Sequence, residues 1–151
     1  MILAASNALQ YVFFAVLAGT LLLQIVPSTH RPALSIPFAV PAAAAALLPV
    51  VSFVPIAQLS WTVAAGREVP FFEALKRILA QYEVGQSWVV LFVLSFFLIG
   101  IFILFFHSTS MPRAAAVVGI VLIIGMIGAL SASGHAANAT SLIGGTLHFF
   151  H

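Results

Sequence analysis

The sequence contains no cysteine and very little charge. Its 151 residues include five Lys or Arg and three Asp or Glu. The absence of cysteine excludes disulfides, thiolate metal ligands and cysteine nucleophiles. The few cations form no run or stripe, so nothing in the sequence indicates nucleic-acid binding. Charged residues make up 5% of the chain, against roughly 25% in soluble domains, which is too little to cover a soluble fold with polar surface.

Long apolar runs take the place of the missing charge. Hydrophobic residues make up 63% of the chain, and four runs approach or exceed the ~20 residues that cross a hydrocarbon core. These runs cover residues 8–26, 38–65, 87–106 and 114–131. The sequence therefore predicts an all-α, polytopic membrane protein. We expect one domain, residues 1–151, formed by a bundle of four spans plus the start of a fifth helix at Leu142.

Prolines interrupt the second predicted span. Pro49 and Pro55 lie inside it, and an interior proline removes a backbone hydrogen bond and kinks the helix. We therefore expect this span to bend, with neighbouring helices bonding to the freed carbonyl groups. Two interpretations remain open. The span is either a kinked helix that serves packing alone or a broken helix that lines a conduit.

All three acidic residues lie between the second and third spans, in residues 66–85. Apolar side chains recur there at helical spacing, with the charged ones on the other side. This pattern is typical of an amphipathic helix that lies in the membrane interface. We interpret its charges as a solvated face rather than a ligand site.

The predicted spans place the loops on two sides of the membrane. The N-terminus and residues 66–86 and 132–141 share one side, and residues 27–37 and 107–113 share the other. Lys and Arg number three on the first side and two on the second, so the positive-inside rule does not decide by count. Because the second side carries cations without acids, we expect it to be cytoplasmic.

Three of the five histidines lie in the last stretch of the chain, which we expect outside: His135, His148 and His151. The last two are three residues apart, so on a helix they would share one face. A short connection through Gly144 and Gly145 would return the chain and bring the third imidazole to them. Imidazole suits Cu, Zn, Fe and Ni, and affinity peaks at Cu(II). We therefore predict a copper site here, against the alternative of polar residues that only meet headgroups.

No catalytic group accompanies these histidines. Ser131 and Ser133 lie near His135, but no acid is placed to orient the imidazole, and the pattern of a nucleophile elbow is absent. We therefore predict no catalytic residues and no enzyme activity.

The other two histidines and one methionine are weaker ligand candidates. His30 and His107 fall at the opposite face, where we interpret them as polar interface residues. Met126 lies nine residues before His135, so the two cannot share a ligand set on one straight helix. We interpret Met126 as packing, although a soft sulfur inside a bundle could relay Cu(I).

The segment Leu130-Ser-Ala-Ser-Gly-His-Ala-Ala137 resembles the Ser-Gly-His-Ala-Ala signature of the copper resistance D family of membrane domains. Leu147-His-Phe-Phe-His151 resembles the His-bearing start of that family's next helix. The resemblance implies a multi-pass plasma-membrane protein that moves copper, usually inward, after receiving it from an extracytoplasmic copper-binding protein or domain. It also implies that His135 and His148 are ligands, with His151 beside them, and that the chain is the N-terminal part of a longer domain.

Two other functions fit the same residues. One is a b-type haem bundle for electron transfer, with His135 and either His148 or His151 on one iron. The other is a non-catalytic subunit that supplies helices to a larger complex, or to further copies of itself. This second function predicts that the protein binds no metal and that every histidine can be substituted without effect.

Overall fold

The computed structural model describes the backbone of residues 2–30, 36–106, 108 and 111–147, and the side chains within these ranges up to residue 131, except at residue 28. Helices account for most of this part of the chain. They are α1 (Ile2–Ile25), the 3₁₀ turn η1 (Ser28–His30), α2 (Ala39–Arg67), α3 (Phe71–Gln81), α4 (Glu83–Leu104) and α5 (Arg113–Leu147). The predicted all-α class is confirmed.

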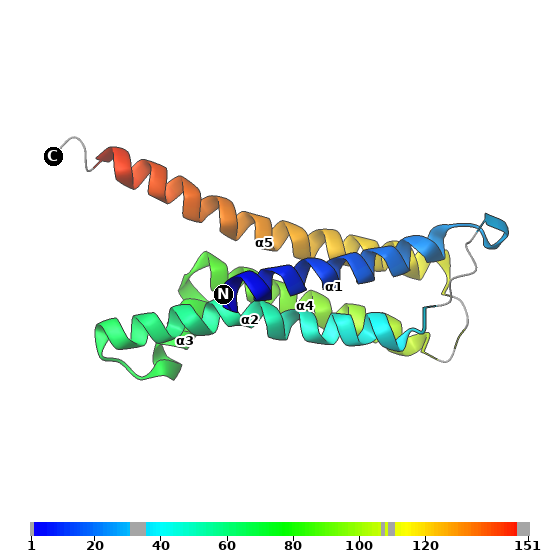
Figure 1. Cartoon of the computed structure of the whole chain (residues 1–151), viewed down its shortest axis with the longest axis horizontal. Coiled ribbons are helices and arrows are strands. Elements are labelled where there is room, and N and C mark those ends of the chain that lie inside the picture. Colours follow the sequence, from blue (N-terminus) through cyan, green and yellow to red (C-terminus); the bar gives the residue numbers. More distant parts are fainter. Residues whose placement is uncertain (1, 31–35, 107, 109–110, 148–151) are drawn as a thin grey trace.

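Four helices form the bundle, in the ring order α1, α2, α4, α5 (Figure 1). α1, α2, α4 and the part of α5 up to Ser131 are long and apolar enough to cross a membrane. The start of α1, the end of α2 and the start of α4 lie at the same end of the bundle, and α5 runs toward that end. We call this the α3 end of the bundle, because α3 lies there. The predicted grouping of the N-terminus with residues 66–86 is therefore confirmed.

The core of the bundle is apolar, and so is much of its outer surface. Fully buried side chains come from all four long helices: Leu17, Leu21, Leu48, Leu91, Leu98, Phe102, Ala116 and Met126. Gly119 lets α1 approach α5, since a Cβ there would lie 2.8 Å from Leu21 Cδ1. Phe96, Leu104 and Ile124 are largely exposed on the outside. Because such a surface requires a lipid solvent, the protein is a multi-pass membrane protein.

α3 has the amphipathic pattern that the sequence predicts. Ala74 and Ile78 are fully buried where α3 packs against α2 and α4, whereas Glu73 and Arg77 are exposed. α2 ends at Arg67, and the next residue, Glu68, adopts a left-handed backbone with φ 52°. Pro70 then precedes the first residue of α3.

α5 differs most from the prediction. It continues to Leu147 as one helix, so the predicted connection at residues 132–141 is wrong, as is a separate helix start at Leu142. The segment is rich in alanine and contains no proline, and alanine is the strongest helix former. Gly144 and Gly145 consequently lie within the helix. Beyond the bundle, α5 diverges from the other helices (Figure 1).

The turn between α3 and α4 depends on Gly85. A Cβ at this position would overlap the Ile78 carbonyl group and lie 2.7 Å from Leu79 Cα. Since backbone atoms cannot move aside as a side chain can, we expect Gly85→Ala to lower the free energy of unfolding by about 1–3 kcal/mol. Thermal unfolding in detergent, followed by circular dichroism, measures this loss.

Gly100→Ala is the matched control for this prediction. Gly100 is also in α4, and a Cβ there would meet nothing within 4 Å. An unfolding midpoint of Gly85→Ala equal to that of Gly100→Ala would contradict the close approach of α3 to α4.

Candidate functional site

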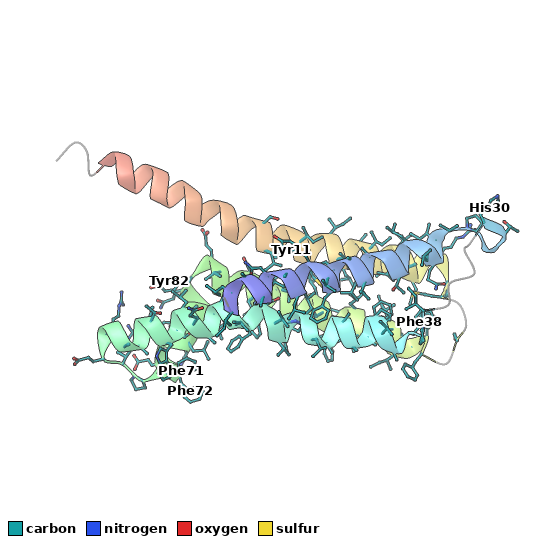
Figure 2. All side chains as sticks on the ribbon, in the orientation of Figure 1. Tyr11, His30, Phe38, Phe71, Phe72 and Tyr82 are labelled. Atoms are coloured by element: carbon teal, nitrogen blue, oxygen red, sulfur yellow. The ribbon has the colours of Figure 1, made fainter. Side chains whose placement is uncertain are left out.

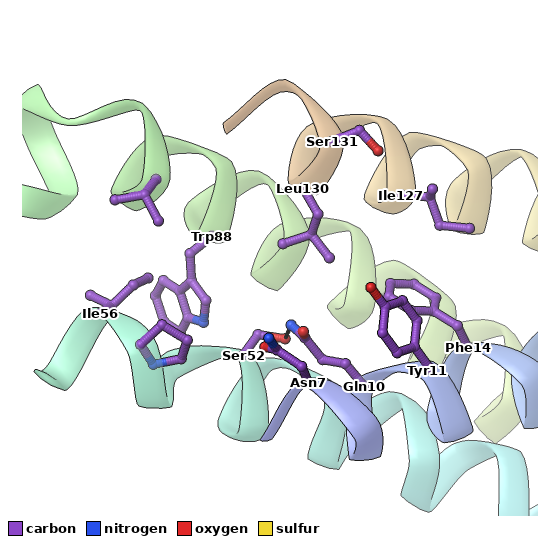
Figure 3. A pocket seen from close by; sticks show the side chains of 12 residues that line it. Asn7, Gln10, Tyr11, Phe14, Ser52, Ile56, Trp88, Ile127, Leu130 and Ser131 are labelled. Carbon is purple, nitrogen blue, oxygen red and sulfur yellow. Dashed lines mark hydrogen bonds between the residues drawn. The ribbon is translucent and has the colours of Figure 1, made fainter. Parts of the chain in front are cut away.

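A cavity of about 550 Å³ lies between the four spanning helices, in the half of the bundle nearer the α3 end (Figure 3). Its lining consists of Asn7, Gln10, Tyr11, Phe14, Ser52, Pro55, Ile56, Val84, Trp88, Ile127, Leu130 and Ser131. These residues offer amides, hydroxyls and an indole, and none of those described carries a charge. The cavity is therefore uncharged, with several polar groups set in a mostly apolar lining.

The proline-interrupted helix α2 forms one wall of this cavity. Pro55 has no amide hydrogen, so it cannot bond to the carbonyl oxygen of Val51 four residues earlier. The Ser6 hydroxyl of α1 donates a hydrogen bond to that oxygen instead, at 2.8 Å. A neighbouring helix thus satisfies the freed carbonyl group, as the sequence predicts.

Further polar groups converge on the turn of α2 that precedes Pro55. Gln10 Nε2 donates to Ser52 Oγ at 2.5 Å, and Ser52 Oγ donates to the Leu48 carbonyl at 2.7 Å. From α4, the Trp88 indole N–H donates to the Pro49 carbonyl at 2.9 Å. Residues 48–52 of α2 are therefore the polar centre of the bundle, bonded from both α1 and α4.

Trp88 lies near the start of α4. Its ring is half-buried against Phe53 and Phe92. Ring centroids are 5.0 Å and 5.4 Å apart, respectively. Buried Trp N–H groups normally have a hydrogen-bond partner, and here the Pro49 carbonyl supplies it.

Sequence reasoning also missed Ser6 and Gln10. A signal was available, because these two polar residues are four apart and so lie on one face of α1. In an otherwise apolar span, such a pair indicates the side that faces a polar partner. The partner atoms themselves depend on the register between α1 and α2, which the sequence does not contain.

Met126 lies one turn of α5 below Leu130 and is fully buried. Its sulfur accepts a weak hydrogen bond from Ser95 Oγ at 3.9 Å. Buried contact with α4 supports the interpretation of Met126 as packing. Among the described residues, Met126 is the one methionine in a spanning helix, and it lies next to Ile127 of the cavity lining.

The three predicted copper ligands lie at or beyond the limit of the described side chains. The backbone position of His135 is one turn past Ser131 on α5, while His148 and His151 lie outside the described residues. Among the side chains that are described, no three His, Asp or Glu gather as metal ligands. The site therefore stays a prediction.

The course of α5 changes how that site would have to form. Twelve residues of continuous helix separate positions 135 and 147, which is about 18 Å along the axis. The return of the chain that was expected to join the imidazoles is thus absent from residues 132–147. Of the other two histidines, His30 is exposed in η1 with Nδ1 2.9 Å from Thr29 Oγ1, and His107 lies outside the described residues.

The fold and the cavity together define a multi-pass helical membrane protein with an uncharged polar interior. The chain matches no protein-family model, no curated protein and no solved structure. The likeness of residues 130–137 to the copper resistance D family accordingly remains a hypothesis based on those residues.

The hydrogen bond from Ser6 to Val51 can be tested by a double-mutant cycle. We expect Ser6→Ala to lower the free energy of unfolding by about 0.6 kcal/mol, the average for hydrogen bonds between membrane helices, and by no more than the maximum of about 1.7 kcal/mol. In a Pro55→Ala background the loss should approach zero, because residue 55 then has an amide hydrogen for the Val51 carbonyl. Reversible unfolding in mixed detergent measures all four proteins.

Ser60→Ala serves as the control, since the Ser60 hydroxyl bonds to Ile56 within its own helix. Its effect should be the same with Pro55 or Ala at position 55. A loss from Ser6→Ala that is equally large in both backgrounds would show that the serine does not replace the missing amide.

Proposed function

We propose that this chain is a copper-handling module of the plasma membrane, a transport protein rather than an enzyme. In this proposal His135, together with His148 and His151, captures copper on the extracytoplasmic side. The ion is the cargo, and the bundle passes it onward and inward. An extracytoplasmic copper-binding protein or domain delivers it, and further helices or a second copy complete the conduit.

One observation carries the proposal. α5 forms the cavity wall at Leu130 and Ser131, and the next turn of the same helix bears Gly134-His135-Ala-Ala, the element that resembles the copper resistance D family. A ligand at position 135 would therefore stand about 6 Å along the helix from the polar cavity. Capture and inward passage would use adjacent turns of one helix.

The chemistry of the cavity is compatible with passage of a metal ion. Its amide and hydroxyl oxygens can replace water around a cation, and the described lining has no Lys or Arg to repel one. Beneath it, the thioether of Met126 is a soft ligand of the kind that suits Cu(I). The uncharged wall also holds no carboxylate to trap the ion, so cargo could leave as well as enter.

Copper titration of the purified protein tests the ligand assignment. We expect His135→Ala to weaken copper binding at least tenfold, because outer-shell changes alone cost 10–100-fold at metal sites. His148→Ala and His151→Ala should weaken it as well. Cu(I) and Cu(II) are titrated separately against a competing chelator, and an absorption spectrum is recorded before copper is added.

His30→Ala is the matched control, because this histidine lies at the opposite end of the bundle. It should bind copper as the parent does. If His135→Ala and His148→Ala bind as tightly as the parent, the site assignment fails. A Soret band that disappears in His135→Ala would instead support the haem function, and a protein that binds neither metal would support the assembly subunit.

A further inference from the structure

α3 has three faces, and only one of them packs against the rest of the protein. Ala74 and Ile78 form the packed face. Glu73 and Arg77 lie on the charged face and form a salt bridge of 2.6 Å between Oε1 and a guanidinium nitrogen. The third face carries Phe72, Leu75 and Leu79. It is apolar, with Phe72 exposed and Leu75 and Leu79 half-buried.

This third face forms a groove of about 370 Å³, and every residue that lines it belongs to α3. The lining residues are Phe72, Leu75, Lys76, Leu79 and Ala80. Four of the five are apolar, and the Phe72 side chain is 77% exposed. The groove thus combines a hydrocarbon surface with a single cation at its edge.

The cation of the groove is available to a ligand. Glu73 is bonded to Arg77, and among the described residues Lys76 has no acidic partner within salt-bridge distance. A lysine can lay its methylene stem along an apolar surface while its ammonium group stays in a polar layer. Lys76 can therefore complete the groove with its stem and present a positive charge at one end.

Neighbouring aromatic rings indicate the depth of the groove in the membrane. Trp61, near the end of α2, is 70% exposed, and its ring centroid lies 6.1 Å from that of Phe71. Phe71 in turn packs edge-on against Phe72 at 5.6 Å, and both phenylalanines lie at the outer side of the α3 end (Figure 2). Exposed Trp side chains favour the headgroup level. We therefore expect the groove at the level where acyl chains meet their headgroups.

We propose that this groove binds an anionic glycerophospholipid. One acyl chain lies against Phe72, Leu75 and Leu79, and the phosphate contacts the Lys76 ammonium group. A second protein is a poorer occupant, because five side chains of one helix are far fewer than the roughly 20–30 residues a stable interface uses on each side. The proposal does not rest on copper handling.

Native mass spectrometry of the full chain tests this, with the detergent-purified protein titrated with phosphatidylglycerol or phosphatidylcholine. We expect the parent to retain phosphatidylglycerol more strongly. Lys76→Gln should weaken that retention about fivefold, the effect of one cation at a membrane surface, while Lys76→Arg should preserve it. Leu79→Asn should weaken the retention of both lipids.

Arg67→Gln is the matched control, since it removes one positive charge from the same end of the bundle but outside the groove. It should retain phosphatidylglycerol as the parent does. Equal retention by the parent and Lys76→Gln would overturn the proposal. An equal loss of retention in Lys76→Gln and Arg67→Gln would also overturn it, because it would show that general positive charge, and not this groove, retains the lipid. A dimer that dissociates in Lys76→Gln would overturn it as well, because the occupant would then be a second protein.

The same variants separate this site from the proposed copper function. Lys76→Gln should bind copper with the affinity of the parent, and His135→Ala should retain phosphatidylglycerol unchanged. Failure of the copper titration therefore leaves the lipid result unaffected, and the reverse also holds.

Discussion

The bundle depends on how α1 satisfies the backbone of α2 where Pro55 interrupts it. In hydrocarbon no water can bond to a carbonyl group that has lost its amide partner, so another part of the protein has to do so. Ser6 supplies that partner for Val51. Because a hydroxyl reaches only one carbonyl at bonding distance, this contact fixes the register of α1 on α2 as well as stabilising it.

The cavity lies beside the same segment of α2. Polar side chains of α1 and α4 point toward this segment. Gln10 and Trp88 do so from opposite sides. The polar groups that bond to α2 thus also belong to the cavity wall. A protein that moves a polar cargo can make use of such a space. The two interpretations of α2, packing and conduit, are to this extent compatible.

Much of the fold could be predicted from the sequence, and the site could not. The apolar runs locate the spanning helices because lipid requires a minimum apolar length, and the charge pattern locates α3. The partners of Trp88 were not predictable, because a tryptophan near the end of a span can turn toward headgroups or toward another helix, and only the neighbouring helix decides. α5 was divided too early because polar residues after Ser131 resemble a loop, whereas their alanines and the absence of proline favour helix. The cavity depends on which residues of different helices face each other, which no local pattern specifies.

The length of α5 has a mechanical consequence. Thirty-five residues of helix extend about 52 Å, well beyond the ~30 Å of a hydrocarbon core. Gly119 holds the first half of the rod closely against α1, while the part beyond Ser131 stands away from the bundle. Such a rod acts as a lever with its pivot at the cavity wall. A tilt of about 10° at Ser131 would move position 147, about 24 Å away along the axis, by about 4 Å. Because Leu130 and Ser131 line the cavity, one continuous helix links the cavity wall to this far arm.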